Sequence, residues 1–474
     1  MKRILTILTA ALLLLSLSVP AFAEGEFRSS DENLDLQKAY YNSDYAYLND
    51  ADSVYRSLTW EEAVYLFQQE GNHLILLGGS WCGNTTPVIG YINEVAKEYG
   101  VDTIYNLDFR LDGSSRASHI RETNGATSQD ALISGSLYNY LYGELVTRYL
   151  TNLNDFVEYT VDSESALSYT DAEGADVTVP KVQVPFLFLY NKDHVSEDGE
   201  AAPIAAGLEL MKVRDDFVDG EKENEEAVAA YKEILRESVF EAVGAVELST
   251  FSDGDYIRLA YNEKSGEELF APGEPIHIET VTYKQLRWLL EQEGSYLILL
   301  GGSWCGNTQA VIKLINDYAV ANHVTVYNFD TKLDGGYARK FWGYEKDLHI
   351  RDNSNEFVAL YGELVSEAFP NIETEYAVDS ENSITDVNAE GETVTVNKLQ
   401  VPYLLAYTKG LEDDIGHFVP ITAYLEQMLT LKADREDYVY APENYAAYTA
   451  GLLEVFQSYA GQLGLEAVEP ANEA

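Results

Sequence analysis

The chain contains two cysteines, and both stand in the same motif. Cys82 and Cys305 each follow a tryptophan and precede Gly-Asn-Thr. The twelve residues LILLGGSWCGNT occur at 74–85 and again at 297–308. A thiol becomes a nucleophile once it loses its proton, so this motif is where we expect chemistry. Cys and His do not cluster at the spacings that bind zinc, and no metal site is expected.

The residues around each cysteine predict a strand, a turn and a helix. An apolar run, 74–77 in the first copy, has the pattern of a strand buried on both faces. Apolar residues at helical spacing follow the cysteine, among them Val88, Ile92 and Val95. Each cysteine is therefore predicted to lie in the first turn of a helix. There, unpaired N–H groups and the positive end of the helix dipole stabilise a thiolate.

Two further residue types flank each thiol. The hydroxyl groups of Thr85 and Thr308, three residues after the cysteines, are expected to donate a hydrogen bond to the sulfur. Trp81 and Trp304 would limit the access of water and offer a flat apolar contact. Together these groups predict a single thiol that attacks a disulfide and forms a mixed disulfide. Its release needs a second thiol, which suits isomerisation or deglutathionylation better than net oxidation.

The identical motifs belong to a duplication that covers most of the chain. The segment TIYNLDFRLDG at 103–113 corresponds to TVYNFDTKLDG at 325–335, and VQVPFL at 182–187 corresponds to LQVPYL at 399–404. Self-similarity of this kind predicts two domains of one fold. We expect a polar N-terminal linker at 24–50, a first domain at 51–245, a second linker at 246–270 and a second domain at 271–470.

Length and charge limit the classes of protein and partner. The chain has 474 residues, of which 46% are hydrophobic, and its net charge is −48. This length suits two or three domains, and the composition excludes general disorder. A protein this acidic repels nucleic acid and anionic membrane surfaces, so neither is expected as a partner.

The first 23 residues have the features of a secretory signal peptide. Lys2 and Arg3 precede an apolar run at 4–19, and residues 21–23, Ala-Phe-Ala, form a small-x-small cleavage site. We expect cleavage before Glu24. The mature protein is then expected to be secreted or otherwise extracytoplasmic, with no membrane association after signal cleavage.

The order of these elements resembles the thioredoxin superfamily. A strand leads into W-C-G-x-x at a helix start, and much later a Val-Pro pair enters another strand, in both copies. The resemblance implies that Pro185 and Pro402 lie beside the sulfur in the cis form, where the preceding backbone pairs with an extended peptide. The expected fold is α/β, with two tandem thioredoxin-like domains. Each would hold a central mixed β-sheet flanked by helices, with a helical insertion before the cis-proline strand.

Two departures from the superfamily pattern bear on mechanism. Its redox motif is C-x-x-C, whereas Thr85 and Thr308 hold the second position here. The acidic residue often found six positions before the first cysteine is absent, since Leu76 and Leu299 stand there. Neither domain alone is expected to run a dithiol–disulfide cycle. The two cysteines remain candidate monothiol nucleophiles that need no cofactor, with exported proteins or low-molecular-weight thiols as expected partners.

Two alternatives remain open. The cysteines could be inert, in a fold used only as a non-catalytic binding or chaperone-like module. Cys82 and Cys305 could instead form an interdomain disulfide that locks the domains face to face.

Two weaker signals recur in both copies. His119 and His349 precede Ile-Arg, and a cation near the sulfur would stabilise a thiolate, although a lone histidine is more often a structural residue. Paired aspartates lack the loop spacing of a calcium site, so we expect solvated turns. These aspartates are Asp108, Asp112, Asp330 and Asp334.

Overall fold

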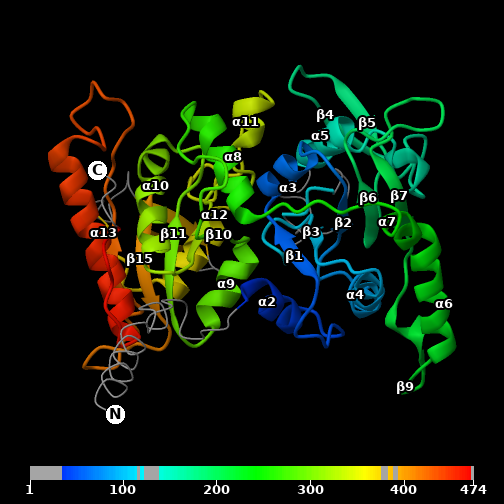
Figure 1. Ribbon diagram of the computed structural model, residues 1–474, viewed down its shortest axis with the longest axis horizontal. Coiled ribbons are helices and arrows are strands. Elements are labelled where there is room, and N and C mark those ends of the chain that lie inside the picture. Colours follow the sequence, from blue (N-terminus) through cyan, green and yellow to red (C-terminus); the bar gives the residue numbers. More distant parts are fainter. Residues whose placement is uncertain (1–34, 115–117, 122–137, 375–382, 388–392, 471–474) are drawn as a thin grey trace, which may run out of the picture.

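The chain folds into mixed α/β structure with two five-stranded sheets flanked by helices (Figure 1). The computed structural model describes residues 35–114, 118–121, 138–374, 383–387 and 393–470. The strand orders are β1-β3-β2-β6-β7 and β10-β12-β11-β15-β16, so one topology occurs twice. The predicted signal peptide at 1–23 lies outside the described residues. Among the helices described, none has the length and apolar character needed to cross a bilayer.

Each sheet is mixed, and one of its five strands runs opposite to the other four. The first sheet contains β1 (Tyr55–Leu58), β2 (His73–Leu77), β3 (Ile104–Leu107), β6 (Phe186–Tyr190) and β7 (Ile204–Glu209). The second contains β10 (Ile278–Thr280), β11 (Ser295–Leu300), β12 (Val326–Phe329), β15 (Tyr403–Thr408) and β16 (Ile421–Leu425). The first three strands of each sheet pair in parallel, whereas β6 pairs antiparallel with both β2 and β7, and β15 with both β11 and β16. Every residue of β2 and β11 is buried, which explains their continuous apolar sequence.

Helices cover both faces of each sheet. They are α3 (Trp60–Phe67), α4 (Ile89–Glu98), α6 (Glu225–Leu235), η5 (Arg236–Phe240) and α7 (Glu241–Val243) in the first half. The second half has α9 (Tyr283–Glu291), α10 (Gly306–Ala321) and α13 (Pro442–Gln462). Both α3 and α9 begin with a capping box, from Thr59 with Glu62 and from Thr282 with Gln285. The short elements η4 (Arg214–Phe217), β8 (Val218–Asp219) and β9 (Lys222–Glu223) precede α6.

The insertion before the Val-Pro strand contains a β-hairpin as well as helices. In the first half it holds α5 (Asn139–Tyr149), η3 (Leu153–Asp155), β4 (Leu167–Thr170) and β5 (Asp176–Val179). In the second it holds α11 (Tyr337–Phe341), α12 (Val358–Glu363), η6 (Leu364–Ala368), β13 (Ser383–Val387) and β14 (Thr393–Asn397). The expectation of a helical insertion is therefore incomplete. Strand β4 alternates buried and exposed residues, the period-two pattern that a helical interpretation overlooks.

Two segments expected to be polar linkers carry packed helices. Helix α2 (Leu36–Asp44) lies within 24–50, and α8 (Asp253–Ser265) lies within 246–270. Both bury aromatic side chains, Tyr40 and Tyr41 in α2 and Tyr256 and Tyr261 in α8. Helix α2 contacts β1 and α9, whereas α8 contacts β10 and α3. Each linker helix thus touches both halves, and Figure 1 shows the pair between them.

Candidate functional site

In the first half the thiol lies beside the Val-Pro pair. Cys82 donates from Sγ to the carbonyl oxygen of Val184 at 3.4 Å, and the peptide bond from Val184 to Pro185 is cis. Cys82 is only 8% exposed. Regular helix begins at Ile89, seven residues later, so the expectation of Cys82 in the first turn of a helix is wrong. Pro87 lacks an N–H, which disfavours regular helix over these residues.

The second half repeats the contact in a more open setting. Cys305 donates from Sγ to the carbonyl oxygen of Val401 at 3.4 Å, and the peptide bond to Pro402 is cis. Cys305 is the N-cap residue of α10, and its carbonyl oxygen accepts from the backbone N–H of Gln309 at 2.9 Å. This thiol is half-buried. Helix α10 therefore begins directly after Cys305, as the sequence predicts for this half.

Both cysteines are free thiols, so no interdomain disulfide is formed. The hydroxyl groups of Thr85 and Thr308 are fully buried and have no hydrogen-bond partner among the described residues. The hydrogen bond from threonine to sulfur expected from the sequence is therefore absent. Each sulfur faces a valine carbonyl instead, which accepts from the thiol.

A half-buried carboxyl group fixes each tryptophan of the motif. Trp81 donates from Nε1 to Asp108 at 2.7 Å, and Trp304 donates to Asp330 at 2.8 Å. Burial raises the pKa of both carboxyl groups to about 7. The expectation of solvated turns is wrong, because these aspartates directly follow buried strands.

The second aspartate of each pair is buried. Asp112 is 2% exposed and Asp334 is fully buried. Asp334 accepts from the backbone N–H groups of Gly336 and Leu348, and burial raises the pKa of its carboxyl to about 6. These side chains organise the loops that follow the strands.

Each tryptophan ring also contacts a cation and an imidazole. The partners are Arg110 and His119 for Trp81, and Lys332 and His349 for Trp304. The charged groups lie 3.9 and 4.1 Å from the ring centroids. Burial lowers the pKa of His349 to about 3, so its imidazole is neutral at neutral pH. His349 therefore does not provide the positive charge near the sulfur that the sequence suggested.

Two arginines of the same His-Ile-Arg motifs reach the Val-Pro segments, which the sequence analysis missed. Arg121 donates from Nη1 to the carbonyl oxygen of Val182, and Arg351 donates to that of Leu399. Each carbonyl stands three residues before the cis-proline. The repeated His-Ile-Arg motif could have indicated this role of the arginines, but only its histidines were considered.

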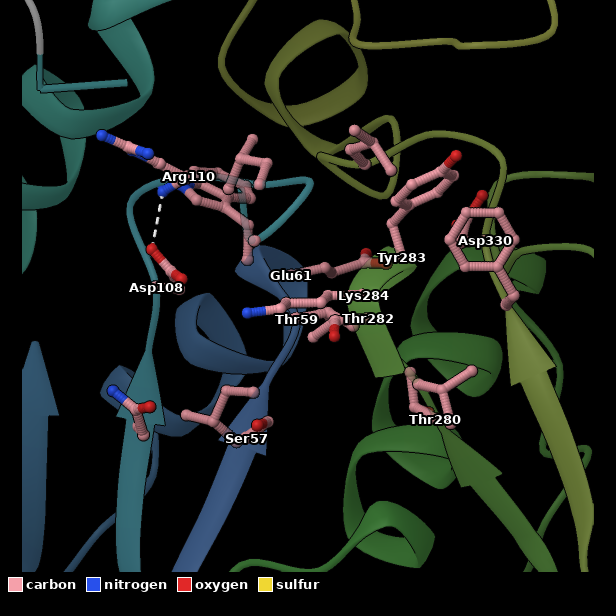
Figure 2. A pocket seen from close by; sticks show the side chains of 18 of the residues that line it. Ser57, Thr59, Glu61, Asp108, Arg110, Thr280, Thr282, Tyr283, Lys284 and Asp330 are labelled. Atoms are coloured by element: carbon pink, nitrogen blue, oxygen red, sulfur yellow. Dashed lines mark hydrogen bonds between the residues drawn. The ribbon is translucent and has the colours of Figure 1, made fainter. Parts of the chain in front are cut away.

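A small cavity lies where the two halves meet (Figure 2). Its volume is about 60 Å³, which suits a few water molecules. Figure 2 shows Ser57, Thr59 and Glu61 of the first half facing Thr280 and Lys284 of the second. The residues that line this cavity include neither cysteine. Within the described parts of the chain, no group of three or more His, Cys, Asp or Glu side chains is placed to hold a metal ion.

Fold and site together define a mixed α/β protein with two similar halves, each holding one free thiol beside a cis-proline. No protein-family description matches the chain, and no curated protein matches it. Among solved structures, "Crystal structure of ERdj5 form I" matches with 10% identity and a TM-score of 0.17, over 88% of this chain and 73% of that one. The human ERp44 zinc-bound form matches with 10% identity and a TM-score of 0.12, over 58% and 77%. At these scores neither likeness supports an argument about function.

Proposed function

We propose that this is a secreted protein of two tandem thioredoxin-like domains that catalyses thiol–disulfide exchange through single thiols. The observation that carries the proposal is the same in both halves. A free thiol lies 3.4 Å from the carbonyl oxygen of the valine that precedes a proline, next to a tryptophan fixed by a half-buried aspartate. Its substrates would be exported proteins or low-molecular-weight disulfides.

The proposed reaction conserves electrons between sulfur atoms. The thiolate of Cys305 attacks one sulfur of a substrate disulfide, so that a new S–S bond forms and the old one breaks. The leaving sulfur departs with the electron pair and takes up the proton that Cys305 released. A thiolate of the same substrate then attacks the mixed disulfide and regenerates Cys305, which gives isomerisation. Glutathione can supply the thiolate instead: a first glutathione displaces the substrate thiol from the mixed disulfide, and a second then displaces Cys305. The substrate is thereby reduced, and the two glutathione molecules leave as one disulfide.

The surroundings of Cys305 assign a role to its neighbours. Trp304, held by Asp330, forms a fixed apolar wall beside the sulfur. The hydrogen bond from Cys305 to Val401 must break before attack, because a thiolate cannot donate. An incoming peptide strand beside the Val-Pro segment would compete for this backbone and free the thiol.

A second function is favoured in the first half. Cys82 is 8% exposed and does not lie at the start of a regular helix, which makes it the poorer nucleophile. We therefore assign the chemistry mainly to Cys305. The first half then serves as a non-catalytic binding or chaperone-like module, with Cys82 as a buried structural residue.

The test is the isomerisation of a protein with scrambled disulfides in a glutathione buffer. Cys305→Ser is expected to lower the rate by about tenfold or more, since it removes the nucleophile. Cys82→Ser is expected to change the rate by less than about twofold. If the double Cys→Ser variant retains the full rate, thiol exchange is excluded and the binding function stands for both halves.

A further inference from the structure

Equivalent positions in the two halves carry opposite charges. Glu61, the second residue of α3, corresponds to Lys284, the second residue of α9. The linker helices carry a matching pair, since Tyr-Asn-x-Asp at 41–44 corresponds to Tyr-Asn-x-Lys at 261–264. Figure 2 shows Glu61 and Lys284 extending across the cavity toward opposite halves.

In the second half these charges hold the loop that carries Cys305. Lys264 forms an ion pair with Glu61, and the two side chains are 0% and 2% exposed. The same ammonium group donates to the hydroxyl of Ser303 and to the carbonyl oxygen of Gly335, both at 2.8 Å. Its three N–H donors are thereby all used. Since Ser303 stands two residues before Cys305, a carboxylate of the first half anchors the thiol loop of the second.

In the first half the corresponding serine is held by a side chain of the second half. Lys284 belongs to the second half, and it donates to the hydroxyl of Ser80 at 2.6 Å. It also pairs with Asp44 of α2 at 2.6 Å, with side chains 26% and 16% exposed. Ser80 stands two residues before Cys82. A lysine of the second half therefore anchors the thiol loop of the first.

Two glycines allow the close approach that these links need. A Cβ atom at Gly335 would lie 2.0 Å from Oε2 of Glu61, and one at Gly113 would lie 2.6 Å from the side chain of Lys284. Both glycines have positive φ, +61° and +75°, which other residues rarely adopt. The backbone is thus shaped in both halves to receive the side chain of the other half.

We infer that each half completes the thiol site of the other. Lys284 is a positioning residue for Cys82 through Ser80, and Glu61 is a positioning residue for Cys305 through Lys264 and Ser303. The inference deepens the proposed function and rests on it in treating Cys305 as the reactive thiol. The opposite charges also favour contact between a first half and a second half. If two first halves came together in the same way, Glu61 of one would face Asp44 of the other, and the two carboxylates would repel each other.

The test measures alkylation of the two thiols separately, by peptide mass, in the folded full-length protein. Lys284→Gln is expected to speed alkylation of Cys82 by about fivefold, because the loop opens more often, and to leave Cys305 unchanged. Glu61→Gln is expected to speed alkylation of Cys305 by a similar factor and to leave Cys82 unchanged. Lys284→Arg, which keeps the charge and a donor, should retain the slow rate at Cys82.

A matched control is Lys313→Gln, which removes a lysine of similar exposure, 28%, paired with Glu274 and Asp317 and not with either cysteine loop. It should change neither rate. Because Glu61→Gln disturbs a buried pair, Ser303→Ala provides a second test. It removes only the hydroxyl of the link and should speed alkylation of Cys305 alone.

The inference is overturned if Lys284→Gln or Glu61→Gln alters the thiol of its own half, both thiols equally, or neither. Alkylation requires no disulfide exchange. A protein that fails the isomerisation assay would therefore still give the crossed pattern if the positioning is correct, and the two proposals fail separately.

Discussion

Replacing Lys264 by methionine is expected to lower the free energy of unfolding by about 3–5 kcal/mol, the usual cost of removing one partner of a buried ion pair. The substitution leaves the carboxylate of Glu61 buried without its countercharge, and the carbonyl oxygen of Gly335 loses its donor. Urea unfolding of the full chain, followed by circular dichroism, measures the loss.

The duplication supplies the control for this prediction. Lys284→Met breaks the equivalent pair with Asp44, whose side chains are partly exposed, and should cost about 1 kcal/mol because water screens the remaining charge. Adding Glu61→Gln to Lys264→Met should restore part of the loss, since the buried charge disappears. Equal losses in Lys264→Met and Lys284→Met would contradict the assignment of Lys264 to a buried, fully paired site.

The pH dependence of stability is expected to report the aspartates that hold the tryptophans. In the folded protein burial raises the pKa of Asp108 and Asp330 to about 7. In the unfolded chain an aspartate titrates near about 3.9. Between these values the folded state keeps a proton that the unfolded state has released. Both groups therefore make the free energy of unfolding fall as pH rises from about 4 to about 7, with no further change above that.

The measurement is the difference in unfolding free energy between pH 5 and pH 8. Asp330→Asn keeps an oxygen to accept from Trp304 but cannot ionise, so it should reduce that difference by about 2 kcal/mol. Asp108→Asn should act alike beside Trp81. Asp162→Asn changes an exposed aspartate and should leave the difference unaltered. A pH dependence of Asp330→Asn identical to that of the original protein would show that Asp330 does not titrate in this range.

Much of the fold follows from local patterns in the sequence. The buried strands are continuous apolar runs in the sequence. Comparison of the two copies located the thiols, the tryptophans and the Val-Pro pairs. Helices α2 and α8 were missed because four tyrosines make up much of their buried faces and charged residues lie beside them. Such a pattern is typical of a polar segment unless its packing partner is known, and part of that partner lies in the other half.

The contacts around the two cysteines could not be predicted from the sequence. The late helix start after Cys82 has a sequence cause, Pro87, which the comparison of apolar positions did not weigh. The hydrogen bond from tryptophan to aspartate joins residues that are 27 positions apart in the first half and 26 in the second. These residues come together only because the strands that precede them are neighbours in the sheet. The opposite charges of Glu61 and Lys284, at equivalent positions of the two halves, can be interpreted only when the two halves are known to face each other.

The most direct test of monothiol exchange is the intact mass of the protein isolated from its native compartment without reductant, with and without alkylation. We expect one of two results, two thiols that alkylate or a mixed-disulfide adduct that maps to Cys305 and is released by glutathione. A mass lower by two hydrogens, with no alkylation, would show that Cys82 and Cys305 are bonded to each other. That result would contradict the proposed mechanism.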